Sequence, residues 1–260
     1  MPRVSVIMPV HNGERFVSEA ITSILRQTFS DFEFLIVDDG STDSTPSILR
    51  SFHDPRIRLL TNDRQRGIVG ALNRALAEAR GTYIARMDAD DRSAPDRLER
   101  QTAFLDREKD VALVGTAAVL IDEQGRERGR ESHPAGAREI RKTIFVHNPF
   151  IHGSVAVRKS VLDECGVYDE RFLHNEDYDL WLRICARHAS ANLPEFLLER
   201  RIHPESITSA KQRELVRYRF RTLFHAIRAY ERKPLYLVYL IRPMAACVFR
   251  RLGGDAPGHS

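Results

Sequence analysis

The chain has 260 residues, of which 42% are hydrophobic and 29% charged, and its formal net charge is +4; these values are ordinary for a soluble globular protein with room for one large domain. The three cysteines lie far apart and form no CxxC pair, which argues against a disulfide framework or a zinc site and favours a reducing cytoplasm. The short apolar run at the N-terminus lacks a small-residue cleavage site, so we expect a first strand there rather than a signal peptide.

Strands and helices are predicted to alternate through the first 90 residues. Continuous apolar runs, typical of buried parallel strands, cover Arg3–Pro9, Phe32–Val37, Ile57–Leu60 and Tyr83–Met87. Helical spacing, or a cap followed by proline, predicts helices over Glu14–Arg26, from Thr45 and over Ile68–Ala79. This alternation predicts a doubly wound, mostly parallel α/β sheet flanked by helices, in which ligands bind beyond the carboxyl ends of the strands.

The second half of the chain is less regular. We expect a long strand, a hairpin or loop, a short strand, a helix and a long basic helix over Val111–Ile121, Glu123–Arg130, Ser154–Val157, Tyr178–Arg187 and Ile207–Tyr230. From Arg201 onward there are 12 Lys and Arg against 4 Asp and Glu. An apolar segment, Leu235–Phe249, is too short to span a bilayer and has basic flanks. It fits a helix lying on a membrane surface or one packed on the core or a second subunit, as in a homodimer.

Acidic side chains follow two of the predicted strands. Asp88 and Asp90 stand two apart after the fourth strand, so they can point the same way and hold Mg²⁺ or Mn²⁺ together with substrate phosphates; the alternative is a solvated acidic turn that caps the helix following Pro95. Asp39 follows the second strand and can accept a hydrogen bond from a pyrimidine imide. Asp43, a few residues further on, is interpreted as a helix cap.

Three further positions are candidates with a structural alternative each. Asp177 lies in an acidic cluster at the start of a predicted helix, where carboxylates usually complement the helix dipole, but one of them could also serve as a general base. His203 follows a predicted strand, and a single histidine is usually structural. His147 and His152 stay open, while Gly153 could let backbone approach a substrate closely.

In order and spacing, four segments resemble family 2 of the inverting glycosyltransferases, which have the GT-A fold. They read VSVIMPVHNGERFVSEAITSILRQTF, FLIVDDGSTDST, GTYIARMDADD and HNEDYDLWLRI. The resemblance runs from Val4 to about Ser206 and implies a glycosyltransferase domain over 1–214 with a helical tail over 215–260. The implied activity moves a sugar from a nucleotide-diphosphate donor, a UDP-sugar in the first instance, to a saccharide or lipid-linked saccharide in surface-polysaccharide synthesis.

The resemblance also implies roles for the residues that match. The backbone at Pro9 and the side chain of His11 would border the nucleobase, although many relatives have Tyr in place of this histidine. Asp39 would bind the base. Asp88 would lie near the ribose or the metal, and Asp90 would coordinate the metal.

The remaining implied roles concern transfer. Asp177 would be the catalytic base, Gly153 would lie near the donor sugar and acceptor, and His203 would complete a Mg²⁺ or Mn²⁺ site. A single displacement with one base inverts the anomeric carbon. The enzyme would be cytoplasmic, with peripheral attachment to the inner face of the membrane through its tail.

Three other functions compete with this interpretation. A sugar-1-phosphate nucleotidyltransferase usually has a glycine- and arginine-rich loop after strand one, where this chain has Pro9–Glu14. A dehydrogenase would show GxGxxG at that place. An inactive binding subunit would not need the acids at Asp90 and Asp177. Nucleic acid is not an expected partner, because the basic helix 211–233 lacks aromatic residues arranged for base stacking.

Overall fold

The structure is a computed structural model that describes residues 1–173, 175–203 and 222. Apart from Thr222, the expected helix Ile207–Tyr230, the segment Leu235–Phe249 and the tail over 215–260 lie outside the described residues. Among the residues that are described, no helix combines the length and apolar character needed to cross a bilayer.

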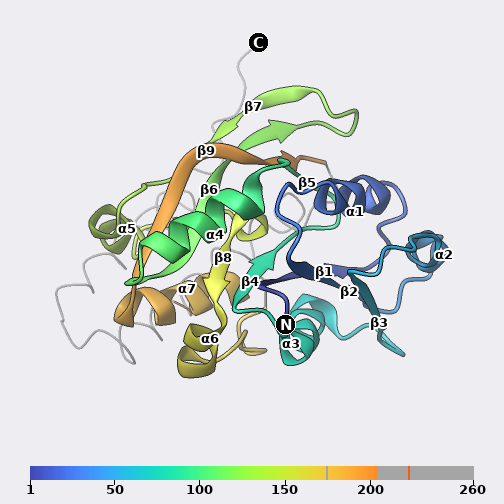
Figure 1. Ribbon diagram of the computed structural model, residues 1–260, viewed down its shortest axis with the longest axis horizontal. Helices are drawn as coiled ribbons and strands as arrows, with labels where there is room; N and C mark the ends of the chain where they lie inside the picture. The colour runs from blue at the N-terminus through green and yellow to red at the C-terminus, as the bar shows by residue number, and fades with distance from the viewer. Residues whose placement is uncertain (174, 204–221, 223–260) are drawn as a thin grey trace, which may run out of the picture.

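Nine strands form one sheet within the described part of the chain, and its first half is parallel (Figure 1). In the order β3-β2-β1-β4, the strands span β1 (Val4–Val10), β2 (Phe32–Asp38), β3 (Ile57–Thr61) and β4 (Tyr83–Arg86). All seven residues of β2 are buried, as expected for a strand with helices on both faces. The predicted doubly wound arrangement is confirmed for this half.

The second half of the sheet mixes strand directions. Its strands are β5 (Arg92–Ser93), β6 (Val111–Ile121), β7 (Glu127–Glu131), β8 (Ala156–Arg158) and β9 (Ala189–Arg201). β8 runs antiparallel to both β4 and β6, whereas β9 runs parallel to β6. The expected hairpin is formed by β6 and β7, and its turn contains Gly125 at φ +77°, a conformation that suits glycine.

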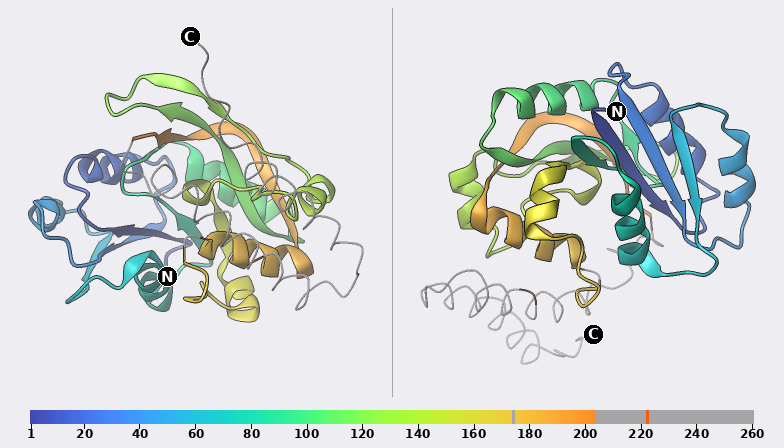
Figure 2. Two further views of the ribbon diagram at one scale, coloured as in Figure 1. Left: turned by 180° about the vertical axis from the view of Figure 1, so that it is seen from behind. Right: turned by 60° about the horizontal axis from the view of Figure 1, so that its bottom comes forward.

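Helices cover both faces of the sheet (Figure 2). One hydrophobic cluster holds side chains of α1 (Val17–Leu25), α2 (Thr45–Ser51) and α4 (Arg97–Arg107). The other holds side chains of α3 (Gly67–Glu78), α5 (Ala137–Thr143), α6 (Lys159–Cys165) and α7 (Glu176–Arg187). β1 contributes to both, because the pleat sends Ile7 into one cluster and Val6 and Met8 into the other. A short 3₁₀ turn, η1 (His152–Ser154), precedes β8.

Candidate active site

The loops that follow β1 and β2 are joined by hydrogen bonds. The Asn12 side-chain oxygen accepts from the N–H of Thr42 at 2.8 Å, and the N–H of Gly13 donates to the Thr45 hydroxyl at 2.8 Å. Asn12 itself adopts φ +52°, which asparagine tolerates better than most residues. Because the two loops satisfy each other's polar groups, they form an ordered wall of the site, at the edge of the sheet beyond β1 and β2.

Asp39 is buried in this wall, with 3% of its surface exposed. Its Oδ1 accepts hydrogen bonds from Asn62 Nδ2 at 2.6 Å and from the N–H of Arg66 at 2.9 Å, and no hydrogen bond from a described residue reaches Oδ2. The His11 ring nitrogen Nδ1 lies 3.0 Å from the Asp39 carbonyl oxygen. Pro9 lies near the end of β1, where it pairs with Val37 of β2. The structure therefore brings the three expected nucleobase residues together.

Asp43 lies at the start of α2, where the sequence analysis interprets it as a helix cap. Its Oδ1 accepts a hydrogen bond from the N–H of Thr45, the first residue of α2, at 2.9 Å. Hydrogen bonds from this end of the helix and from the N–H of Glu14 hold the pKa of Asp43 below its usual value, against the opposing effect of its burial. Asp43 is therefore a capping residue, unlike Asp39.

The acids after β4 form a turn rather than a continuation of the strand, since β4 ends at Arg86 and the turn lies at residues 89–90. Asp88 forms an ion pair with the buried Arg86. Asp90 Oδ2 lies 3.0 Å from His203 Nε2, so the two residues expected to hold a metal are in contact. The turn does not cap α4, whose N-cap is Asp96.

The chemistry of this acid turn, Asp88–Asp91, fits a divalent cation. Burial, followed by the charges of Asp88 and Asp90, raises the pKa of Asp91 well above its usual value. Asp88 and Asp90 are accessible, with side chains 35% and 33% exposed. Clustered carboxylates of this kind repel one another, and a hard cation with oxygen ligands relieves that repulsion. Asp90, His203 and Asp88 are the residues that could hold it.

Gly153 lies directly against the acid turn. A Cβ at this position would stand 2.7 Å from Asp88 Oδ2 and 3.0 Å from Asp91 Oδ2. Such contacts are too short for any side chain larger than hydrogen, so only glycine lets both carboxylates keep their places. The structure shows that the backbone here lies close to the acids, and its close approach to a substrate stays a prediction.

Glu176 and Asp177 are the first two residues of α7. Asp177 Oδ2 accepts from Asn148 Nδ2 at 2.7 Å, and Oδ1 accepts from the N–H of Tyr178 at 2.7 Å. Burial raises the pKa of Asp177 above its usual value, although both hydrogen bonds oppose the shift. Burial, and then the charge of Asp177, raises the pKa of Glu176 to about 7. Glu176 Oε2 is buried without a hydrogen-bond partner among the described residues.

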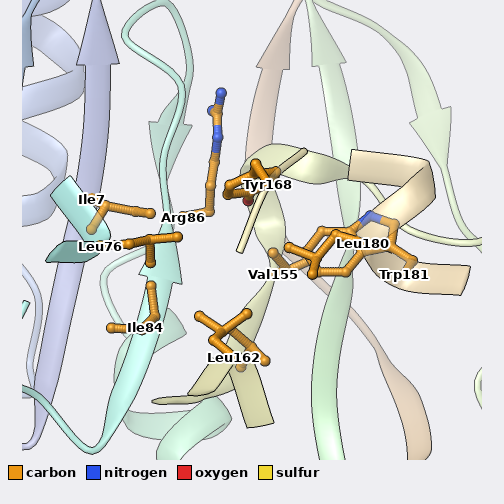
Figure 3. Close-up of a pocket in the computed structure, with 10 residues that line it drawn as sticks. Ile7, Leu76, Ile84, Arg86, Val155, Leu162, Tyr168, Leu180 and Trp181 are labelled. Carbon is orange, nitrogen blue, oxygen red and sulfur yellow. The ribbon is translucent and has the colours of Figure 1, made fainter. Parts of the chain in front are cut away.

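Arg86 connects the acid turn with the start of α7. Its side chain is 2% exposed, and Figure 3 shows it rising from β4 beside Tyr168, with Trp181 of α7 across a small apolar pocket. Its positive charge lowers the pKa of both Glu176 and Asp177 against the effect of burial. The two acidic motifs therefore share one buried cation.

The second ambiguous histidine belongs to this interior. His152 Nε2 lies 2.8 Å from the Tyr168 hydroxyl, and its ring packs edge-on against Trp181 at 6.0 Å between centroids. Burial, and then the charge of Arg86, holds the pKa of His152 well below its usual value. The imidazole is therefore neutral at physiological pH and positions Tyr168 by a hydrogen bond.

Sequence reasoning missed Arg86, Asn148 and Arg201, which all contact the predicted acids. Arg86 is a single cation at the end of an apolar strand, and Asn148 stands 29 positions before its partner Asp177. Arg201 donates to the Asp90 carbonyl across 111 positions. Asn148 and Arg201 belong to no local motif, whereas Arg86 lies within the segment GTYIARMDADD, two positions before Asp88. The signal that was present in the sequence is the unusual polarity of Arg86 within a strand otherwise destined for the core.

Comparison with known proteins places this site in context. Residues 5–166 match the model of glycosyl transferase family 2. The chain is 31% identical over 219 residues to Escherichia coli WfgD, a UDP-Glc:alpha-D-GlcNAc-diphosphoundecaprenol beta-1,3-glucosyltransferase, covering 82% of this chain and 83% of WfgD. Alignments with the first curated relatives span from 66% to 83% of their length.

Two solved structures share the fold. S. aureus TarS 1–349, in complex with UDP-GlcNAc, matches with a TM-score of 0.73 and 20% identity, over 89% of this chain and 68% of that one. The mannosyltransferase PcManGT from Pyrobaculum calidifontis, in complex with GDP-Man and Mn²⁺, matches with a TM-score of 0.64 and 22% identity, over 98% and 77%. The curled, helix-flanked sheet is therefore of the GT-A type.

Proposed function

The chain belongs to glycosyl transferase family 2, and on this premise we propose that it is a metal-dependent, inverting hexosyltransferase of surface-polysaccharide synthesis. Its donor is a nucleotide-diphosphate sugar, a UDP-sugar in the first instance, and its acceptor is a hydroxyl of a saccharide or lipid-linked saccharide. The observation that carries the proposal is the contact between Asp90 and His203, 3.0 Å apart, at an acid turn that also pairs Asp88 with the buried Arg86. The UDP-Glc donor of WfgD and the UDP-GlcNAc bound to TarS support the donor class.

The proposed donor site extends from the nucleobase wall to the acid turn. Asp39 accepts the imide N–H of the base through its remaining oxygen, and His11 with the backbone at Pro9 borders the ring. Asp90 and His203 hold Mg²⁺ or Mn²⁺, and Asp88 lies by the ribose or the metal. When bound, the ion neutralises charge on the departing diphosphate; the Mn²⁺ in PcManGT supports this choice.

Transfer requires a base for the acceptor hydroxyl, and we assign this role to Asp177. Asn148 holds one of its oxygens at 2.7 Å, while each carboxylate oxygen keeps a second lone pair for a proton. One base and one displacement invert the anomeric carbon. Gly153 lets the acid turn lie close to the part of the site where we place the acceptor. The chain works at the cytoplasmic face of the membrane, with the tail over 215–260 as its proposed contact.

Asp177→Asn tests the proposal. We expect transfer to fall by about 10²–10⁴-fold, since the proton acceptor is lost, while donor binding measured by calorimetry with Mn²⁺ stays near normal. Asp163→Asn, which changes an exposed acid of α6, is the matched control and should transfer normally. Near-normal transfer by Asp177→Asn would move the role to Glu176, because Asp179 is already engaged by Arg183 at 2.9 Å.

A binding subunit without activity would behave differently. It would bind a nucleotide sugar without producing transfer or donor hydrolysis under any metal condition. Turnover with Mn²⁺ that disappears on chelation, and returns on adding the ion, is therefore the expected result for the wild-type chain. Pyrophosphate release from a nucleoside triphosphate would instead identify a nucleotidyltransferase.

A further inference from the structure

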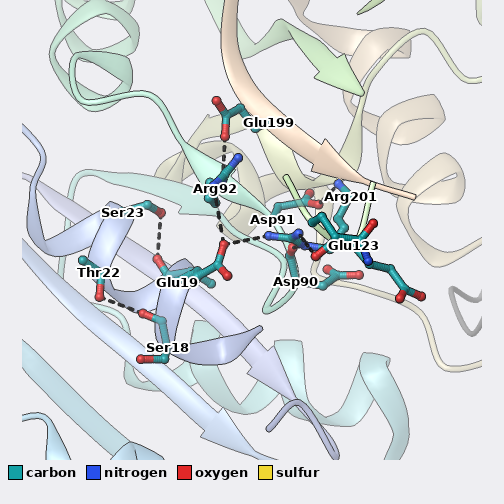
Figure 4. Close-up of polar contacts among 12 residues, drawn as sticks. Ser18, Glu19, Thr22, Ser23, Asp90, Asp91, Arg92, Glu123, Glu199 and Arg201 are labelled. Atoms are coloured by element: carbon teal, nitrogen blue, oxygen red, sulfur yellow. Dashed lines mark hydrogen bonds and ion pairs between the residues drawn. The ribbon is translucent and has the colours of Figure 1, made fainter. Parts of the chain in front are cut away.

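Arg201, the last residue of β9, lies under the acid turn with its side chain 1% exposed. Its Nε donates to the Asp90 carbonyl at 2.8 Å. Its Nη1 donates to the carbonyls of Asp122 and Glu123, at 3.0 and 3.1 Å, in the turn between β6 and β7. Figure 4 shows Arg201 beside Asp90 and Glu123. The peptide that carries the Asp90 side chain is thus fixed from below by a cation.

Further contacts of Arg201 connect α1 to the same point. Its Nη2 donates to Glu19 Oε2 at 2.9 Å, and its guanidinium lies 4.3 Å from the centre of the Phe16 ring. The His203 imidazole also lies beside that ring, at 5.6 Å between centroids. The backbone N–H of Arg201 also donates to Asp91 Oδ1 at 2.8 Å. One residue therefore contacts the acid turn twice and, through Phe16, supports His203.

We propose that Arg201 is a positioning residue for the divalent-cation site, which fixes Asp90 directly and His203 through Phe16. This inference rests on the proposed function, because it presumes that Asp90 and His203 bind the ion. A planar guanidinium can donate to three carbonyls and a carboxylate at once, whereas a lysine ammonium has three donors on a flexible stem. Groups that orient metal ligands in this way typically change metal affinity or activity by about 10–100-fold when mutated.

A purely structural role for Arg201 is the competing explanation. Arg158 provides the matched control, because it also donates to three backbone carbonyls, those of Val111, Leu105 and Glu108. It pairs with Tyr83, the first residue of β4, at the end of the strand remote from the acid turn. Arg158→Lys should lower the melting temperature without changing cation affinity.

The test measures Mn²⁺ binding directly, by electron paramagnetic resonance on the full chain in the wild-type, Arg201→Lys and Arg158→Lys proteins. We expect the Kd for Mn²⁺ to rise about 10–100-fold in Arg201→Lys and to stay unchanged in Arg158→Lys. Saturating Mn²⁺ should restore most of the kcat of Arg201→Lys, and its affinity for UDP without metal should match the wild type. If Arg201→Lys does not fold, Phe16→Leu should weaken Mn²⁺ binding severalfold.

Two results would overturn the inference. Equal Mn²⁺ affinity in Arg201→Lys and the wild type, with the same for Phe16→Leu, would leave Arg201 a structural residue and the proposed function intact. Absence of Mn²⁺ and Mg²⁺ binding by the wild-type protein would remove the cation site from the proposed function and this inference with it. The wild-type measurement therefore separates the two failures.

Discussion

The two sides of the site differ in how far their polar groups are satisfied. On the nucleobase side, the loops after β1 and β2 bond to each other, and Asp39 accepts two hydrogen bonds from the protein. The transfer side comprises the acid turn, Arg86 and the start of α7. Within the described residues, Arg86 Nε and Glu176 Oε2 on this side are buried and make no hydrogen bond. A buried polar group without a partner destabilises a fold by about 1–3 kcal/mol.

This difference teaches that the two sides have different tasks. A wall whose two loops are already held by hydrogen bonds to each other can select a rigid aromatic base without rearranging. An interior with buried polar atoms that lack a hydrogen bond lies next to the groups that we propose exchange a proton and a sugar, and unsatisfied buried groups concentrate at such places. We therefore expect changes on the transfer side to reduce the rate, and changes on the nucleobase side to reduce donor affinity.

Among the changes that test this comparison of the two sides, the largest effect is expected for Gly153→Ala. The new methyl group would meet Asp88 Oδ2 at 2.7 Å and Asp91 Oδ2 at 3.0 Å, so the carboxylates of the acid turn must move. Because small misplacement of reacting groups can reduce rates about 10²-fold, we expect a loss of that order in kcat. Gly129→Ala, whose Cβ would make an ordinary 3.7 Å contact with Leu120, should leave kcat unchanged. Similar rates for the two variants would show that the turn tolerates displacement.

A smaller effect, of a different kind, is expected for Asp39→Ala. The variant loses the carboxylate proposed to accept the imide proton, and a charge-assisted hydrogen bond is worth about 1.5–3 kcal/mol. The KM for the UDP-sugar should rise about 10–100-fold, while kcat at saturating donor stays within a few fold. Steady-state kinetics decide the matter: a fall in kcat at unchanged KM would break the division between the two sides.

The smallest effect, a change in pH dependence, is expected for Asn148→Ala. The Asn148 amide donates to Asp177 and opposes the rise in the pKa of that carboxyl caused by burial. Its removal raises the pKa further, and because the base must be ionised, the acidic limb of the kcat profile moves to higher pH. Transfer should therefore fall severalfold on the acidic limb and change little on the plateau above it. Asn148→Asp, which adds a like charge, should move the limb further in the same direction. An unmoved limb in both variants would mean that Asp177 is not the titrating base.

How much of this could be predicted from sequence depended on whether the signal was local. The strand Val111–Ile121 was predicted with the bounds that the structure shows, since a long apolar run needs no knowledge of its partners. α5 and α6, of seven residues each, are too short for helical periodicity to appear and were not predicted. The mixed direction of the second half of the sheet depends on how β8 inserts between β4 and β6, which no local pattern encodes.

The site divides in the same way. Asp39, Asp88, Asp90 and Asp177 stand at the ends of regular elements, where sequence motifs could mark them. Asp88 pairs with Arg86 of the same motif, but the side-chain partners of the other acids come from elsewhere in the chain. Arg201 reaches Asp90 only because β9 pairs along the whole length of β6 and returns to the acid turn. The choice of Gly153 likewise follows from two carboxylates that are distant in sequence.

The stretch from Asn148 to Gly153 has a consequence for how the enzyme keeps its reactants aligned. One end of it contacts Asp177 and the other end lies against Asp88, so a single short length of backbone runs from the proposed base to the acid turn. Lengthening this stretch by one residue would alter their spacing while leaving every strand of the sheet in register.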